Sequence, residues 1–239
     1  MNPQAKLVFT MSLLLGTSIT ISSNHWIMAW TGLEINTLAI LPFISKSHHP
    51  RAIEAATKYF LVQATASALV LFSSMVNAWQ TGQWDITQLT HPMACTVFTA
   101  AIAMKLGLVP FHFWFPEVLQ GSSLTIGLIL STIMKFPPIT LMYLTSGSLN
   151  PILLTTMAVL STILGGWMGL NQTQIRKILA FSSISHLGWM TIILIYSPKL
   201  TLLNFYLYTI MTAATFLALN TMKAMKLSTL MTSWAKSPA

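Results

Sequence analysis

The sequence predicts an all-α protein, a polytopic bundle of about eight transmembrane helices. Of its 239 residues, 54% are hydrophobic and only 7% are charged, and the mean hydropathy is +0.68. An ordinary soluble domain carries about 25% charged residues. A spanning helix needs about 20 mostly apolar residues, and stretches of that kind follow one another along the chain with short connections.

Eight apolar stretches are long enough to cross a bilayer. In chain order they are residues 3–21, 25–44, 56–79, 92–109 with a continuation to 119, 124–144, 150–170, 175–196 and 202–222. Because so little sequence lies between them, we expect residues 1–239 to form a single transmembrane domain with no soluble domain. The chain also contains no glycine-rich phosphate loop or dinucleotide fingerprint.

The basic residues outside the spans indicate the orientation in the membrane. With eight spans, one connecting side holds only Lys199, together with the acidic Asp85. The side of the N-terminus holds Lys6, Lys46, Arg51, Lys58, Arg176, Lys177, Lys223, Lys226 and Lys236. This excess predicts an N-terminus on the negative, matrix-like or cytoplasmic side. Scattered loop lysines do not form the contiguous basic face that nucleic-acid binding requires, so we expect no nucleic-acid partner.

Cofactor and metal signatures are missing from the sequence. Cys95 is the only cysteine, and a lone thiol in an apolar segment is typical of a packing residue. His48 and His49 form a loop pair without a third ligand nearby. Matched histidine pairs for b-type haem are also absent from the predicted spans. We therefore expect neither a metal nor a cofactor on this chain.

Three ionisable residues lie where a charge is most costly. Glu34, Lys105 and Lys135 each stand near the middle of an apolar stretch, where a charge costs about 2.5–3.5 kcal/mol on insertion scales. Such residues usually face an interior path or a partner. Glu34 is either a permanently protonated acid that bonds a neighbouring helix or a titrating carboxylate paired with a lysine from another span.

Each of the two lysines precedes a proline on its predicted helix. Pro110 lacks the N–H that would bond the carbonyl of Leu106, so it tends to break the helix after Lys105. Pro137 and Pro138 do the same after Lys135, with release of the carbonyls of Ile133 and Met134. Irregular backbone at membrane depth is tolerated only inside protein or beside water. We expect both lysines to be buried there, although a purely structural lysine could snorkel to the interface.

Two histidines lie deeper than the others. His112 follows the predicted Pro110 break, and His186 shares a helix face with Ser182 and Ser183. A lone histidine on an apolar helix is usually a hydrogen-bonded core residue, but a polar ladder beside it suits a proton relay. Both interpretations stay open for His112 and His186.

Two runs of sequence resemble a known family. Residues 105–118, KLGLVPFHFWFPEV, and 176–188, RKILAFSSISHLG, resemble signatures of the antiporter-like subunits of respiratory complex I. The Pro116-Glu117-Val118 triplet and the Met1-Asn2-Pro3 start are similar to the vertebrate mitochondrial form, which lacks three leading helices of its bacterial relatives. The resemblance covers essentially the whole chain.

The resemblance implies an antiporter-like fold of two inverted repeats with broken helices, the second repeat being incomplete here. It implies that Glu34 pairs with Lys105, that Lys135 is the central lysine, and that His186 carries the relay onward. From its position after the Pro110 break, we count His112 as a further candidate for proton translocation. The family continues to another lysine on a second broken helix, so we expect the full protein to extend beyond residue 239.

The function implied is proton translocation by a core membrane subunit of NADH:ubiquinone reductase. The resemblance places the chain in the mitochondrial inner membrane, with its N-terminus on the matrix side. Its partners would be membrane lipids and other membrane-arm subunits, both antiporter-like and small. NADH, flavin, iron–sulfur clusters and ubiquinone would bind other subunits. Two alternatives stay open: a stand-alone cation/proton antiporter, and a structural membrane-arm subunit whose buried charges only fix helix register.

Overall fold

The computed structural model describes residues 2–47, 49–222 and 227–234, and this part of the chain is built from helices. The all-α prediction is confirmed. The α-helices are α1 (Pro3–Ser22), α2 (Trp26–Ile44), α3 (Pro50–Thr81), α4 (Pro92–Leu106), α5 (Trp114–Gly121), α6 (Leu124–Ser131), α7 (Phe136–Leu144), α8 (Pro151–Leu170), α9 (Ile175–Tyr196), α10 (Pro198–Thr221) and α11 (Leu227–Trp234). Two short 3₁₀ turns, η1 (Ser45–Ser47) and η2 (Ile133–Lys135), complete the described elements.

Seven helical segments of the described chain are long and apolar enough to cross a membrane. They are α1, α2, α3, the α6–η2–α7 unit, α8, α9 and α10. The predicted fourth span is divided into α4 and α5, so a continuous helix as far as residue 119 is not formed. Gly107 ends α4 in the left-handed conformation, with φ 79°, which glycine adopts without steric cost. The helix therefore ends at Leu106, four residues before Pro110, the residue predicted to break it.

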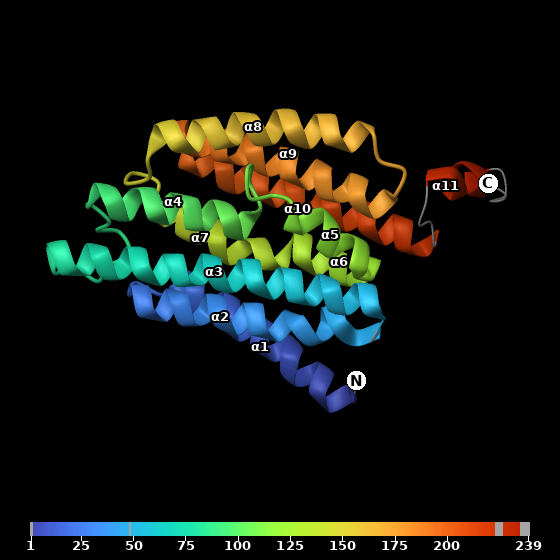
Figure 1. The fold of residues 1–239 in the computed structure, drawn as a ribbon, viewed down its shortest axis with the longest axis horizontal. Coiled ribbons are helices and arrows are strands. Elements are labelled where there is room, and N and C mark those ends of the chain that lie inside the picture. The colour runs from blue at the N-terminus through green and yellow to red at the C-terminus, as the bar shows by residue number, and fades with distance from the viewer. Residues whose placement is uncertain (1, 48, 223–226, 235–239) are drawn as a thin grey trace.

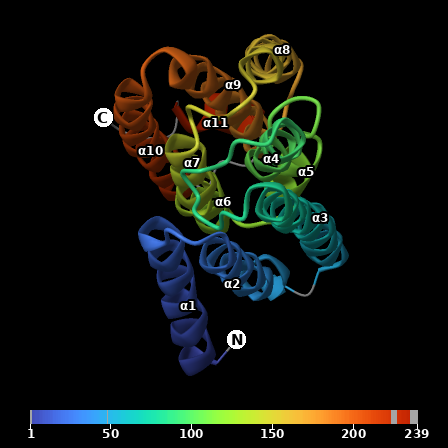
Figure 2. The same ribbon diagram turned by 90° about the vertical axis from the view of Figure 1, so that its left-hand side faces the viewer.

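The helices run side by side, and the α6–α7 unit lies at the centre of the bundle (Figures 1 and 2). Of the apolar window in this unit, 61% is buried, against 17% in α1 and in α10. Seen end-on, α1, α2, α3, α4, α9 and α10 surround the unit, while α8 lies outermost against α9 (Figure 2). Lys135 thus belongs to the most buried of the seven candidate spans.

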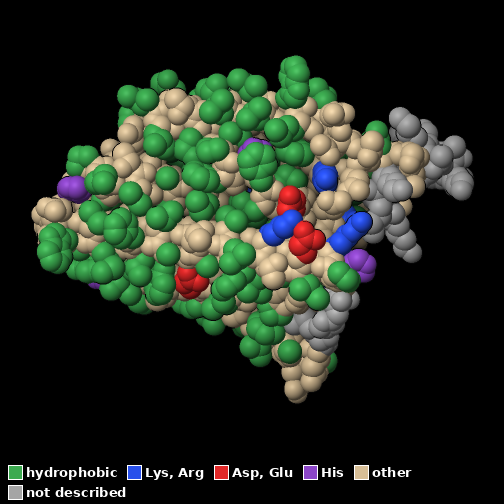
Figure 3. All heavy atoms as spheres, in the orientation of Figure 1, with side chains coloured by type: hydrophobic (Ala, Val, Ile, Leu, Met, Phe, Trp, Pro, Cys, Tyr) green, Lys and Arg blue, Asp and Glu red, His purple; other side chains and the backbone are tan. Residues whose placement is uncertain are grey.

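Charged side chains gather at the end of the bundle that holds both termini (Figure 3), and hydrophobic side chains cover most of the remaining face. Lys46 lies in the connection between α2 and α3 at that end, and Arg51 and the Arg176–Lys177 pair lie in the first turns of α3 and α9. Asp85, in the connection between α3 and α4, and Lys199, in the first turn of α10, lie at the opposite end. His48, Lys223, Lys226 and Lys236 lie outside the described residues.

Helices α8 and α9 approach each other closely at two glycines. A methyl group added at Gly188 would lie 2.5 Å from the Oγ of Ser161 and 2.8 Å from the carbonyl oxygen of Ala158. One added at Gly165 would lie 2.9 Å from the backbone nitrogen of Ser185. Small residues allow this backbone contact, which drives helix association where lipid removes the hydrophobic effect.

We expect Gly188→Ala to destabilise the α8–α9 pair, because the added methyl group meets backbone as well as side chain. Overpacking of this kind costs about 1–3 kcal/mol, which should lower the thermal unfolding midpoint in detergent or nanodiscs. Gly166→Ala is the matched control, since nothing lies within 4 Å of its added methyl group. An equal midpoint for the two variants would contradict the close contact.

Candidate functional site

Lys105 lies in the last turn of α4 and is buried, with 6% of its surface exposed. Its Nζ has no hydrogen-bond partner among the described residues. The lysine does not snorkel to an interface. Its backbone lies where the helix ends, so the carbonyls around it lose their helical donors.

Two side chains replace the missing donors at the end of α4. The Nε2 of Gln63, on α3, donates to the carbonyl of Lys105 at 3.3 Å. The Nε1 of Trp114, the first residue of α5, donates to the carbonyl of Met104 at 3.2 Å. An unpaired carbonyl in hydrocarbon costs several kcal/mol, so these two donors allow α4 to end inside the bundle.

Glu34 is held by hydroxyl groups. The Oγ of Ser67, on α3, donates to its Oε1, and the Oγ1 of Thr37 donates to its Oε2 at 3.2 Å. Within the described residues, salt bridges join Lys58 to Glu54 and Glu117, and none joins Glu34 to Lys105. The implied direct pair with Lys105 is therefore not formed in this structure. Instead, Ser67 and Thr37 bind the carboxylate, and Gln63 binds the backbone carbonyl of Lys105.

Lys135 lies inside the interruption of its helix. Helix α6 ends at Ser131, Lys135 closes η2, and Phe136 begins α7. The expectation that the break follows the lysine is wrong, because Pro137 and Pro138 occupy the first turn of α7, where proline is well tolerated. Proline cannot extend a helix backward through its missing N–H, so the irregular turn lies before the prolines and includes the lysine.

Two aromatic residues enclose the ammonium of Lys135, which is 3% exposed. Its Nζ lies 4.5 Å from the ring centroid of Phe115, on α5, and 5.3 Å from that of Tyr208, on α10. The same Nζ donates to the hydroxyl of Tyr208 at 3.2 Å. That hydroxyl donates to the carbonyl of Ser131 at 3.1 Å, a carbonyl released where α6 ends. Ring faces attract cations, so the two rings and the Tyr208 hydroxyl offset part of the cost of burying an ammonium without a carboxylate.

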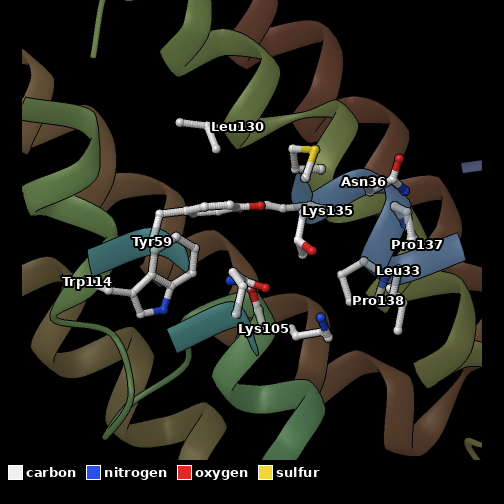
Figure 4. A pocket seen from close by; sticks show the side chains of 12 residues that line it. Leu33, Asn36, Tyr59, Lys105, Trp114, Leu130, Lys135, Pro137 and Pro138 are labelled. Carbon is white, nitrogen blue, oxygen red and sulfur yellow. Dashed lines mark hydrogen bonds between the residues drawn. The ribbon is translucent and has the colours of Figure 1, made fainter. Parts of the chain in front are cut away.

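One cavity of about 20 Å³ is lined by both lysines (Figure 4). A buried water requires about 10–15 Å³ of such volume, so this cavity has room for about one. Its polar lining includes Gln63, which bonds the Lys105 carbonyl, and Thr37, which bonds Glu34. The hydroxyl-bearing Tyr59, 2% exposed, also lines it. Glu34 is therefore linked through Thr37 to a space that Lys105 and Lys135 share.

The two histidines differ in their surroundings. His112 is 2% exposed and follows the break after α4, and neither ring nitrogen has a partner among the described residues. His186 is half-buried on α9, and its ring centroid lies 5.5 Å from that of Tyr208. Ser182 and Ser183 donate to the carbonyls of Leu179 and Ala180 on their own helix, and the Ser183 side chain also interacts with Tyr208. His186 meets the lysine site through Tyr208.

Helix α5 connects this site to the charged end of the bundle. The Nζ of Lys58, on α3, lies 2.6 Å from a carboxylate oxygen of both Glu54 and Glu117. Farther along the same short helix, Trp114 holds the end of α4 and Phe115 faces Lys135. A solvent-exposed ion pair contributes little stability, so the buried residues of α5, such as Phe115 and Val118, mainly hold the helix in place.

The structure places four of the five predicted residues in one connected region. Lys105 and Lys135 share a cavity, Glu34 reaches it through Thr37, and His186 contacts Tyr208. The described contacts do not bring His112 to the cavity lining. Five further residues of this region were not predicted from the sequence: Gln63, Trp114, Phe115, Tyr59 and Tyr208. For Trp114 and Phe115, the aromatic run after the predicted break was an available signal.

A buried path of ionisable residues in a bundle of broken helices defines an ion- or proton-translocating class of membrane protein. A family model described as NADH:quinone oxidoreductase/Mrp antiporter, TM, matches residues 23–236. The chain belongs to this family. The expected antiporter-like fold is thereby confirmed.

Individual relatives indicate which member of the family this chain is similar to in sequence. The NADH-ubiquinone oxidoreductase chain 2 of Struthio camelus is 76% identical over 238 residues, which cover 100% of this chain and 69% of that relative. The similarity to subunit 2 of the mitochondrial NADH:ubiquinone oxidoreductase, which the Pro116-Glu117-Val118 triplet indicated, is therefore confirmed.

Solved structures agree with this placement. A chain in the respiratory complex I from Thermus thermophilus with bound aureothin has a TM-score of 0.83 and 27% identity, over 92% of this chain and 52% of that chain. A chain of the Mrp complex from Dietzia sp. DQ12-45-1b has a TM-score of 0.82 at 18% identity, over 88% of this chain and 44% of that chain. The second likeness supports the fold alone.

We expect Trp114→Phe to destabilise the junction between α4 and α5, because it removes the only indole donor to the Met104 carbonyl and leaves the ring volume nearly filled. A buried polar group left unsatisfied costs about 1–3 kcal/mol, measurable as a lower thermal midpoint. Trp167→Phe on α8 is the control, since that indole is 76% exposed. Equal midpoints would show that the Trp114 hydrogen bond contributes nothing.

Proposed function

We propose that this chain is a proton-translocating core subunit of the membrane arm of respiratory complex I. The observation that carries the proposal is that the buried Lys105 and Lys135 line the same cavity. Glu34 is hydrogen-bonded to Thr37, which also lines that cavity. Its 76% identity with the NADH-ubiquinone oxidoreductase chain 2 of Struthio camelus supports the assignment to that complex.

The chain moves protons and carries out no redox chemistry. NADH, flavin, iron–sulfur clusters and ubiquinone bind other subunits of the complex. The neighbours of the chain are antiporter-like and small membrane-arm subunits together with lipid. Its location is the mitochondrial inner membrane, with the end of the bundle that carries Lys46, Arg51 and Arg176 toward the matrix. Protons enter from that end and leave at the opposite end.

Coupling between the lysines is electrostatic. Two charges in a low-dielectric interior interact far more strongly than in water, so a change of charge at Glu34 or Lys105 alters the potential at Lys135. The cavity gives the two ammonium groups a common space for about one water. A proton that leaves Lys135 on the side away from this cavity meets Tyr208 and then His186. Redox events elsewhere in the complex drive the change of charge at Glu34 and Lys105.

Lys135→Met in the intact complex should lower the number of protons pumped per electron, because methionine fills the space but cannot carry a proton. Removing a positioned proton carrier slows transfer by about 10²-fold or more. The measurement is proton release and NADH oxidation in sealed vesicles, with Lys199→Met, an exposed lysine of α10, as control. Unchanged stoichiometry would refute the proposal. Sodium-dependent proton flux from the chain reconstituted alone would favour an independent antiporter.

The combined variant Glu34→Gln and Lys105→Met separates proton transport from a structural role. Both changes keep side-chain volume and remove charge, so we expect the complex to assemble while NADH-driven proton pumping falls at least several-fold. Native gels report assembly, and vesicle acidification reports pumping. A purely structural subunit predicts the reverse, with defective assembly and normal pumping in the complexes that do form.

A further inference from the structure

Tyr208 is an unusual residue for its helix. Only 17% of the apolar window of α10 is buried, yet Tyr208 is 2% exposed and points into the bundle. The other buried residues of α10 are Thr201 and the two phenylalanines Phe205 and Phe216. A phenol hydroxyl needs a partner when it is buried, and this one bonds to Lys135 and Ser131 and also interacts with the Ser183 side chain.

The two hydrogen bonds of the Tyr208 hydroxyl have opposite directions. The hydroxyl accepts from the Nζ of Lys135 at 3.2 Å and donates to the carbonyl of Ser131 at 3.1 Å. A phenol has one proton to donate. While that proton is bonded to Ser131, the hydroxyl can receive a hydrogen bond from Lys135 but cannot pass a proton to any other group.

The same side chain also adjoins the histidine of the proposed path. The ring of Tyr208 lies 5.5 Å from the ring of His186, centroid to centroid, at an angle of 50°. On the opposite side of Lys135, Phe115 lies 4.5 Å from the ammonium and offers only a ring face. Of the two aromatic residues around Lys135, only Tyr208 offers a route for a proton.

We propose that Tyr208 is a proton relay that closes and opens the step from Lys135 to His186, an inference that rests on the proposed function. In the closed arrangement its proton is bonded to Ser131. When the hydroxyl rotates away from that carbonyl, one N–H bond of the Lys135 ammonium breaks as the phenol oxygen takes that proton. The phenol releases its own proton to the imidazole of His186, directly or through a water. Lysine becomes neutral, histidine becomes cationic, and tyrosine is unchanged.

The carbonyl of Ser131 gives the closed state its stability. This carbonyl exists as a free acceptor only because α6 ends there, and it needs a donor at membrane depth. Opening therefore requires either another donor for Ser131 or a change in the turn at residues 132–135. A change of charge at Lys105 would shift η2 and so change this turn, since Lys105 and Lys135 line the same cavity.

Tyr208→Phe tests the inference by removal of one oxygen atom, because the ring and its packing remain. In intact complex in sealed vesicles, we expect protons pumped per electron to fall about tenfold or more, with assembly unchanged on native gels. Tyr206→Phe is the matched control, since Tyr206 lies on the same helix and is 57% exposed. Wild-type pumping by Tyr208→Phe would overturn the inference.

Two further variants separate a relay from mere support. Tyr208→His keeps a ring that can accept and donate a proton, and we expect it to restore part of the pumping lost in Tyr208→Phe. Equal loss in both variants would overturn the relay. Combining Tyr208→Phe with Lys135→Met should pump no less than Lys135→Met alone, because both residues act in one step. An additive loss would place Tyr208 outside the path.

The two sets of variants test the role of Tyr208 separately from the proposed function of proton translocation. Normal pumping by Lys135→Met defeats the proposed function, whereas loss with Lys135→Met and normal pumping with Tyr208→Phe defeats only the role of Tyr208. Should the tyrosine variants fail to assemble, a high-resolution map of the unmodified complex during turnover decides the matter. A class of particles in which the hydroxyl has left Ser131 supports the gate. Its retention there in every class overturns it.

Discussion

A backbone carbonyl that loses its helical partner inside a hydrocarbon layer finds no water to replace it, and both interrupted helices of this chain are organised by that constraint. Gln63 and Trp114 donate to the carbonyls at the end of α4, and Tyr208 donates to the one at the end of α6. Each donor comes from a different helix. The breaks therefore fix how α3, α5 and α10 must pack against the α4 and α6–α7 units.

The same constraint explains why the lysines lie where they do. A helix break supplies carbonyl dipoles, polar donors and a small space, which together make a buried ammonium less costly than it would be on a regular helix. Lys105 lies in the turn that Gln63 and Trp114 hold, and Lys135 lies beside the bond from Tyr208 to Ser131. Each buried lysine therefore lies at a helix break because the break supplies the polar groups that a buried ammonium needs.

The sequence predicted the helices and the burial of both lysines, since these depend on local composition and on proline. It located the breaks less well. Gly107 ends α4 before Pro110, because a left-handed cap offers a lower-energy end than a proline clash. Contacts between residues far apart in the chain were not predicted from the sequence. Tyr208 is 73 positions from Lys135 and Gln63 is 42 from Lys105, and an apolar pattern does not specify which side chain meets a broken helix.

The Glu34–Lys105 pair that the resemblance implied is a second case in which the sequence did not specify a contact between distant residues. Local sequence indicated two buried charges of opposite sign, and attraction between them was a reasonable inference. The structure satisfies the carboxylate with Ser67 and Thr37 instead. Hydroxyl groups of this kind can hold either form of a carboxyl group, so the acid is not committed to a single partner.

The glycine contacts between α8 and α9 have a mechanical consequence for His186. Because the backbones touch at Gly165 and Gly188, α9 cannot slide along its neighbour without a collision of main-chain atoms. Both contacts flank His186 within one turn of helix. The backbone that carries the imidazole of His186 is thus held in place by α8. Any reorientation of the imidazole is a rotation about its own side-chain bonds.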